Sequence, residues 1–252
     1  MIFDQNNQLK QLYKSAPVTF INIIAVTIMF LVTIFTGGFG GENLLRWGAL
    51  FTPSVYFNGE YYRLFTVMYL HGSVTHYIFN TMFGLFLISS SLERMIGSFK
   101  FAIIYFISGI GASLLIYVVY LITGTPSLGV GASGAIYGVL GAFLFLTFYR
   151  SEWFSPSDIS SIRGLIIINV IFTILVPNVS LEAHLGGLVS GFLLIAILNP
   201  KRHYRKKHQG FNSPFESQYD PFDPNIDPFE ALEEVTYVDD DDDDDDPWGR
   251  YS

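Results

Sequence analysis

The sequence predicts an all-α polytopic membrane protein, with a bundle of six transmembrane helices and a disordered cytoplasmic tail. Half of its 252 residues are hydrophobic and only 14% are charged, whereas about a quarter of a soluble domain is charged. Of the 36 Asp, Glu, Lys and Arg residues, 21 lie between positions 201 and 252. This composition excludes a water-soluble globule and a basic nucleic-acid-binding domain. The absence of cysteine excludes disulfides, cysteine-ligated metals and thiol nucleophiles.

Long stretches without charged residues give the expected helices in order. A spanning helix needs roughly 20 mostly apolar residues, because about 30 Å of hydrocarbon is crossed at 1.5 Å per residue. The 49 uncharged residues from 101 to 149 are enough for two spans, which turn residues at 123–131 separate. The six expected spans are 17–36, 64–92, the two halves of 101–149, 164–179 and 183–198.

The distribution of basic residues predicts a multi-pass protein of the cell membrane with both termini in the cytoplasm. In a six-span arrangement only Arg46 and Arg63 fall on the outer side, and cytoplasmic loops are normally the ones enriched in Lys and Arg. The basic residues on the other side include Lys10, Lys14, Arg94, Lys100, Arg150, Arg163, Lys201, Arg202, Arg205, Lys206 and Lys207. The loop at 38–63 is then outside, and its aromatic residues suit a segment in the membrane interface.

Three parts of the chain follow from this arrangement. Residues 1–16 form a cytoplasmic N-terminal segment, residues 17–200 the membrane domain, and residues 201–252 a basic cluster followed by an acidic tail. The tail includes eight consecutive Asp residues, 239–246, and shows no helical or strand periodicity. Charge repulsion and the lack of apolar area predict disorder, which we favour over a cation-binding or partner-binding role for the Asp run.

Polar residues begin three of the predicted spans on the outer side, where polar groups are costly and usually functional. His76 and Asn80 are four residues apart near the start of the second span, so they share one helical face. Ser133 and Tyr137 do the same at the start of the fourth, and His184 begins the sixth. All of these side chains are expected at one depth, which is hard to explain by packing alone.

Small residues explain how the fourth and sixth spans could approach each other. Glycines spaced by four residues let transmembrane helices pack closely. The two pairs are Gly134 with Gly138, and Gly187 with Gly191. Such a contact would bring Ser133 and His184 together. The competing interpretation is that Ser133 only bonds the carbonyl four residues earlier in its own helix, as isolated membrane serines usually do.

Together the polar residues make a complete set for peptide hydrolysis. A serine hydroxyl needs a base to take its proton, and His184 can serve Ser133 in that role. Asn80 and His76, with the Ser133 backbone N–H, can stabilise the oxyanion that forms. No acidic residue lies at that depth, so we expect a dyad whose imidazole is held by stacking on Tyr137. The prediction includes no cofactor and no metal ion.

These residues resemble the rhomboid family of intramembrane serine proteases over about residues 55–200. The motifs that carry the resemblance are Tyr61-Tyr62-Arg63, His71-x4-His76-x3-Asn80, Glu93-x3-Gly97, Gly131-Ala-Ser133-Gly134 and Ala183-His184-x2-Gly187-x3-Gly191. The resemblance implies that Ser133 is the nucleophile, that His184 is its base, and that Gly131 shapes the oxyanion loop. It also implies a compact six-helix bundle with a water-filled cavity open to the outside. The fifth span and the loop at 177–182 would form gate and cap.

The resemblance further implies that the substrates are single-span membrane proteins, cut near their outer end after a small residue. The lipid bilayer is the other expected partner, and nucleic acid is not one. The sequence departs from the family at Tyr62, where Trp is usual, and by one extra residue between Asn80 and Glu93, which predicts a bulge at the cytoplasmic end of the second span.

The alternative function is a catalytically inactive rhomboid-like scaffold that binds client proteins, but Ser133 and His184 are both present. A channel or transporter is disfavoured because the spans carry no acidic residue.

Overall fold

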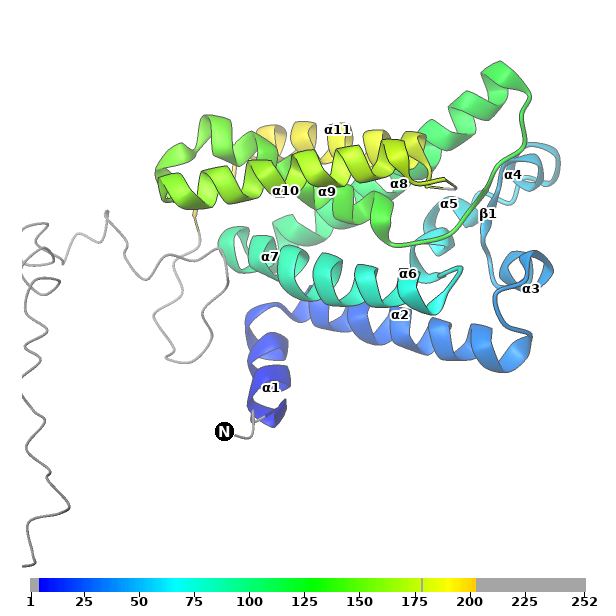
Figure 1. Cartoon of the computed structure of the whole chain (residues 1–252), viewed down its shortest axis with the longest axis horizontal. Coiled ribbons are helices and arrows are strands. Elements are labelled where there is room, and N and C mark those ends of the chain that lie inside the picture. The colour runs from blue at the N-terminus through cyan, green and yellow to red at the C-terminus, as the bar shows by residue number, and fades with distance from the viewer. Residues whose placement is uncertain (1–4, 178, 203–252) are drawn as a thin grey trace, which may run out of the picture. The chain divides into compact units, whose positions relative to one another are not determined.

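The structure is a computed structural model that describes residues 5–177 and 179–202, and in these ranges the chain is mostly helical (Figure 1). Its elements are α1 (Gln5–Ser15), α2 (Pro17–Thr36), α3 (Gly41–Arg46), β1 (Leu50–Phe51), α4 (Thr52–Asn58), α5 (Arg63–Thr66), the 3₁₀ helix η1 (Val67–Tyr69), α6 (Val74–Ile78), the π-helix η2 (Phe79–Ser89), α7 (Ser90–Ile96), α8 (Ser98–Thr123), β2 (Leu128–Gly129), α9 (Ser133–Tyr149), the 3₁₀ helix η3 (Ser151–Trp153), α10 (Pro156–Leu175) and α11 (Leu181–Leu198). The two short strands pair antiparallel. The predicted all-α membrane bundle is confirmed, whereas the predicted disordered tail lies outside the described residues.

The number of full-length spans differs from the six predicted. In the described part of the chain, four helices are long and apolar enough to cross a membrane: α2, α8, α10 and α11. Helix α9 has only 17 residues, about 25 Å at 1.5 Å per residue. The expected second span consists of α6, η2 and α7 in direct succession. Six helical segments are therefore present in the predicted order, but two of them are not single long helices.

The second segment begins ten residues later than predicted. Residues 64–69, expected in the span, belong to the short helices α5 and η1, and the helix starts only at Val74. The Ser73 side chain accepts a hydrogen bond from the His76 backbone N–H, 3.1 Å away, and so caps α6. The bulge predicted at the cytoplasmic end of this segment is instead a π-helix over Phe79–Ser89, which includes Asn80. A π-helical turn accommodates more residues than an α-helical turn.

Helix α9 lies at the centre of the bundle, in contact with α8, α10, α11 and η2. Twelve of its 17 residues are buried. Small residues allow these contacts: a Cβ added at Gly84 of η2 would lie 3.0 Å from Cγ1 of Ile136, and one at Gly134 would lie 2.6 Å from Cβ of Ala112. Because lipid offers no hydrophobic drive for association, such close van der Waals packing is the main force holding spans together.

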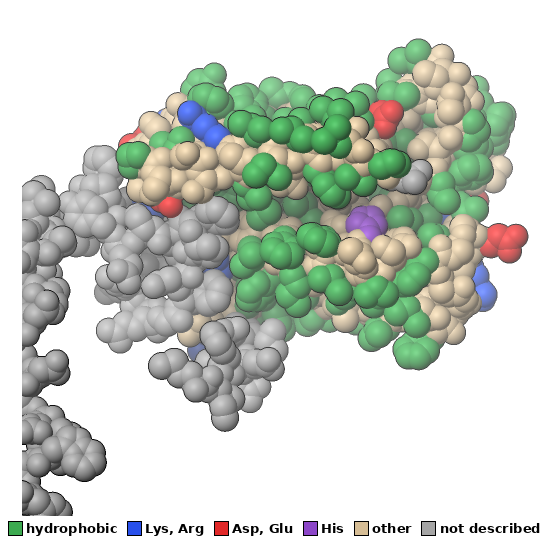
Figure 2. All heavy atoms as spheres, viewed as in Figure 1, with side chains coloured by type: hydrophobic (Ala, Val, Ile, Leu, Met, Phe, Trp, Pro, Cys, Tyr) green, Lys and Arg blue, Asp and Glu red, His purple; other side chains and the backbone are tan. Residues whose placement is uncertain are grey.

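Apolar side chains cover the outside of the bundle, as expected in lipid. Figure 2 shows hydrophobic groups over most of the visible face of α10 and of the helices next to it. On α2, Phe35 is 82% exposed, and on α10 Leu175 is 72% exposed. A soluble monomer rarely exposes contiguous apolar surface of this extent, so these faces fit a hydrocarbon environment.

A buried carboxylate joins α7 to the start of α2. Both oxygens of Glu93, which is 1% exposed, accept backbone hydrogen bonds, from Val18 N at 2.9 Å and from Thr19 N at 2.8 Å. The first N–H groups of a helix have no partner within the helix, and they carry the positive end of its dipole. Glu93 thus satisfies two of these groups and holds α2 against the second segment.

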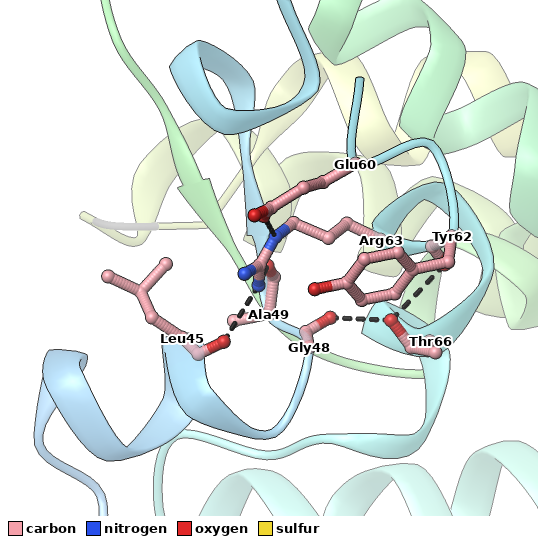
Figure 3. A network of polar contacts seen from close by, with 7 residues as sticks. All are labelled: Leu45, Gly48, Ala49, Glu60, Tyr62, Arg63 and Thr66. Carbon is pink, nitrogen blue, oxygen red and sulfur yellow. Dashed lines mark hydrogen bonds and ion pairs between the residues drawn. The ribbon is translucent and has the colours of Figure 1, made fainter. Parts of the chain in front are cut away.

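The predicted interface loop is organised by Arg63, as Figure 3 shows. Its guanidinium donates to the carbonyl oxygens of Leu45 and Ala49, both at 2.8 Å, and forms an ion pair with Glu60 at 2.5 Å. The hydroxyl of Thr66 donates to the carbonyl of Gly48 at 2.7 Å. The hydrogen bonds from Arg63 and Thr66 to the carbonyls of residues 45, 48 and 49 hold α5 against α3 and the chain that leads into β1. The loop therefore has a defined conformation.

Candidate active site

Ser133 is the first residue of α9 and lies beside Gly131 and His76. Gly131 has φ +129°, a conformation that favours glycine. A Cβ at Gly131 would lie 2.8 Å from Nε2 of His76 and 3.5 Å from Oγ of Ser133. Its backbone N–H donates to the carbonyl of Val67 at 3.0 Å, which anchors the loop. A side chain at position 131 would therefore strike the imidazole, and the glycine keeps the space between these two groups open.

The start of α9 supplies hydrogen-bond donors at the same place. The first N–H groups of a helix have no partner four residues earlier, and the helix dipole makes this end positive. For α9 these are the amides that begin at Ser133. These amides are potential donors to an anionic oxygen that forms next to the Ser133 side chain.

His76 and Asn80 follow from the capped start of α6. The Asn80 side-chain amide donates to the carbonyl of His76 at 2.9 Å, and Asn80 is 7% exposed. The ring of His76 meets that of His71 edge to face, with centroids 5.0 Å apart. His71 is fully buried, and neither of its ring nitrogens has a hydrogen-bond partner in the part of the chain that the structure describes. Packing against His71 thus orients the His76 imidazole toward Gly131.

His184 lies in the first turn of α11, and its imidazole is held between two other helices. The ring is stacked on Tyr137 of α9, with a centroid distance of 3.8 Å and an interplanar angle of 11°. Its Nδ1 lies 2.7 Å from Oγ1 of Thr173 on α10. The side chain is 7% exposed. The stacking partner is the one that the four-residue spacing of Ser133 and Tyr137 predicts.

Thr173 is the site residue that the sequence did not predict. A signal for it was present: Asn169 and Thr173 are two polar residues four positions apart in an otherwise apolar segment, so they share one helical face. Their rotation relative to α11 could not be read from the sequence. No acidic side chain is hydrogen-bonded to His184 within residues 5–177 and 179–202, which leaves the hydroxyl as the polar partner of Nδ1.

The glycine pairs bring α9 and α11 into backbone contact. A Cβ at Gly187 would lie 3.0 Å from the carbonyl carbon of Gly134, and one at Gly191 would lie 2.6 Å from Cα of Gly138. Ser133 directly precedes the first of these contacts on α9, and His184 is three residues before it on α11. Both side chains therefore belong to the same end of the α9–α11 contact. In the described ranges His184 hydrogen-bonds to Thr173 and to the carbonyl of Ser180, and not to Ser133.

A family model for the Rhomboid domain matches residues 58–201. The chain belongs to the rhomboid family. Rhomboid protease GluP of Bacillus subtilis is 35% identical over 175 residues, which are 69% of this chain and 33% of GluP. YdcA of the same organism is 37% identical over 148 residues, 59% of this chain and 72% of YdcA. RHOMBOID-like protein 1 of Arabidopsis thaliana is 35% identical over 191 residues, 71% of this chain and 47% of that protein.

This rhomboid chain spans about a third of the length of GluP and about half of RHOMBOID-like protein 1. The matched region 58–201 includes the segments that start α6, α9 and α11, together with the loop at Arg63. It leaves out α1, α2, α3 and β1, and all residues from Arg202 onward. Rhomboid membership and the apolar helices show a multi-pass membrane protein of a family that includes proteases.

Proposed function

We propose that the chain is an intramembrane serine endopeptidase that cleaves the transmembrane segments of single-span proteins near their outer end through a Ser133–His184 dyad. The observation that supports it most is the seating of the His184 imidazole between Tyr137 and Thr173, one helical turn from Ser133 along α9. Rhomboid membership, with relatives named as proteases, supports the same reaction.

In this mechanism the Ser133 oxygen attacks the scissile carbonyl while Nε2 of His184 takes the hydroxyl proton. The tetrahedral intermediate collapses when the imidazolium gives that proton to the leaving amine, and an ester on Ser133 remains. Water then attacks the ester with His184 again acting as base, and releases the carboxyl product. The hydrogen bond between Ser133 Oγ and Nε2 forms with substrate bound, because catalytic hydrogen bonds often tighten only in that complex.

Three groups are the proposed donors to the developing oxyanion. The Ser133 N–H lies at the start of α9, and the His76 ring approaches across Gly131. The Asn80 amide has two hydrogens, of which one goes to the His76 carbonyl, so the second is available. Donors that are already in place stabilise the charge that develops in the transition state without a reorganisation cost.

The depth of the site follows from the length of α9. A helix of about 25 Å does not cross about 30 Å of hydrocarbon, so an α9 that reaches the cytoplasmic boundary starts below the outer one. We place both termini in the cytoplasm and the site toward the outside, in accord with the basic residues. Helix α10 and the loop at 177–182 are the proposed gate and cap, since only Ile162, Ile166 and Thr173 of α10 are buried.

Labelling with a fluorophosphonate probe tests the proposal. The purified full chain in detergent should be labelled, and peptide mapping should place the label on Ser133. Ser133→Ala should abolish labelling and the cleavage of a transmembrane reporter. Ser113→Ala is a matched control, because Ser113 is a buried span serine whose hydroxyl, among the described residues, bonds only the Gly109 carbonyl of its own helix, at 3.2 Å.

The outcomes of these experiments separate the proposed protease from a scaffold. The Ser113→Ala variant should retain wild-type labelling and cleavage. Substantial reporter cleavage by Ser133→Ala would rule out Ser133 as the nucleophile. A folded wild-type chain that binds the reporter, is not labelled and does not cut it would instead support the rhomboid-like scaffold.

A further inference from the structure

We propose that Thr173 is a positioning residue that holds His184 in the tautomer with a proton on Nδ1, which leaves Nε2 free to act as the base. This inference rests on the proposed serine protease function and adds a third residue to the machinery. Thr173 does not touch substrate or the reacting atoms; it acts through the imidazole.

The first support is a cluster of short polar contacts shared by three helices. Oγ1 of Thr173 lies 2.7 Å from Nδ1 of His184, 2.5 Å from the Tyr137 hydroxyl and 2.9 Å from the Asn169 carbonyl. The Tyr137 hydroxyl also donates to that carbonyl, at 2.7 Å. Thr173 is 4% exposed and His184 is 7% exposed. The cluster thus joins α9, α10 and α11 in a place with little water to compete for its hydrogen bonds.

The number of protons in this cluster favours one tautomer of His184. The Asn169 carbonyl can only accept, so it must receive hydrogens from Thr173, from Tyr137 or from both. If Nδ1 carries a proton, it donates to Thr173, which donates to the carbonyl, and Tyr137 supplies a third hydrogen bond. If Nδ1 carries no proton, only the hydroxyl protons of Thr173 and Tyr137 are available. These two protons must then serve four close contacts: the contact of Thr173 with Nδ1, the contact of Thr173 with Tyr137, and the contacts of both hydroxyls with the Asn169 carbonyl. The Nδ1–H tautomer satisfies one more contact, and a buried contact left without a proton is costly.

The chemistry of the dyad requires this tautomer. Only an imidazole with an unprotonated Nε2 can take the Ser133 proton, and in serine proteases with a triad a buried carboxylate holds the imidazole in that form. Within the described residues the position next to Nδ1 is occupied by the Thr173 hydroxyl. A neutral hydroxyl selects the same tautomer, but it stabilises the imidazolium less than a carboxylate does.

A purely structural role for Thr173 is the alternative. Threonine in a transmembrane helix commonly bonds the carbonyl four residues earlier, and Thr173 does bond Asn169 in this way. Thr33 of α2 provides the matched case: it is fully buried and bonds the Met29 carbonyl at 2.7 Å, and it lies on a helix that holds none of the proposed site residues. Both threonines therefore donate a hydrogen bond to a carbonyl of their own helix, and they differ in that Thr173 also contacts a histidine.

The test compares Thr173→Val, Thr173→Ser and Thr33→Val in the full chain with a purified transmembrane substrate. Valine keeps the shape and removes the hydroxyl. Loss of the group that holds the tautomer costs about 10⁴-fold when it is a carboxylate, so a weaker neutral partner should cost roughly 10–100-fold in kcat. KM should stay within about twofold of wild type, because Thr173 is only 4% exposed and contacts Nδ1 of His184, not the nitrogen that takes the proton. Thr173→Ser should restore most of kcat, and Thr33→Val should leave kcat unchanged.

Nitrogen NMR of ¹⁵N-histidine-labelled protein supplies a readout that does not depend on activity. The signals of His184 among the five histidines are assigned by difference with a His184→Gln sample. Wild type and Thr173→Ser should show a protonated Nδ1, and Thr173→Val should show an increased Nε2–H population. Thr33→Val should match wild type.

The results separate this inference from the proposed function. A Thr173→Val protein with wild-type kcat and tautomer would overturn the positioning role, and so would a folded Thr173→Ser protein as impaired as the valine variant. If wild type neither cleaves nor reacts with the fluorophosphonate, the protease proposal fails. The NMR comparison still decides in that case whether Thr173 sets the tautomer of His184.

Discussion

Replacing Gly187 with alanine should lower both the stability and the cleavage rate, because α9 and α11 are in backbone contact at this position. A Cβ there would overlap the carbonyl oxygen of Gly134, and it would lie 3.0 Å from the carbonyl carbon of Gly134 and 3.3 Å from the backbone nitrogen of Gly138. Non-bonded carbon atoms keep a separation of about 3.5–4.0 Å, and the oxygen is closer to the Cβ than either of the other two atoms, so the two helices must move apart by more than about 1 Å. None of the opposing atoms belongs to a side chain that could turn away.

The size of this displacement sets the expected effects. An extra methyl group in a well-packed core typically costs about 1–3 kcal/mol of stability. A misplacement of about 1 Å between reacting groups can cost about 10²-fold in rate. Because Ser133 and His184 lie at the end of this helix contact, we expect kcat to fall roughly 10–100-fold in Gly187→Ala and the free energy of unfolding to fall by about 1–3 kcal/mol.

Gly164→Ala in α10 is the matched control, since a Cβ at Gly164 would meet no atom within 4 Å. Alanine is also the better helix former, so this variant should be at least as stable as wild type. Thermal unfolding in detergent and cleavage of a purified transmembrane reporter are measured on both variants. Equal stability and activity of Gly187→Ala and Gly164→Ala would refute the close approach of α9 and α11. Lower stability with unchanged turnover would refute the link from that approach to the dyad.

Three further predictions concern the oxyanion donors, the buried Glu93 and the C-terminal tail. His76→Ala and Asn80→Ala should each lower kcat without abolishing cleavage, because the Ser133 amide remains; wild-type kinetics in the double variant would show that the pair is only packing. Glu93→Gln should lower the free energy of unfolding by about 1–3 kcal/mol, because the amide oxygen can accept from only one of the Val18 and Thr19 N–H groups that the carboxylate now binds. Glu42 is exposed, so Glu42→Gln should leave the free energy of unfolding unchanged. Truncation after His208 should leave cleavage in detergent unchanged, because every residue of the proposed mechanism precedes it; loss of activity in a folded, inserted truncation would give the tail a regulatory role.

The sequence predicted the helices best where the absence of charged residues alone defines them. The uncharged stretches located α2 and α8, and the break after Thr123 was recognised from turn residues; Gly124 there adopts φ +69°, which favours glycine. The start of the second segment was wrong because apolar residues continue through α5 and η1. The cap at Ser73 and the π-helix at Phe79–Ser89 depend on hydrogen bonds that hydropathy does not report.

The candidate site was predictable to the extent that it depends on spacing within one helix. The relation of Ser133 to Tyr137 follows from the helical period, and that of Gly187 to Gly191 follows in the same way. Thr173 depends on how α10 is rotated against α11, and the hydrogen bonds of Arg63 depend on carbonyls that 14 and 18 residues of chain separate from it. Such relations arise from tertiary packing, and a single sequence contains no direct signal for them.

The contact between Thr173 and His184 also limits how α10 can act as the proposed gate. The helix buries few side chains, so it is the least firmly held of the apolar spans around α9, and local opening starts where buried contacts are few. Yet one of its buried residues is bonded to the imidazole. A displacement of the whole helix would remove Thr173 from His184 and release the tautomer that the base requires. In the proposed mechanism, substrate entry past a displaced α10 and the chemical step therefore occur in sequence, and the return of Thr173 to Nδ1 completes the site after the substrate has entered.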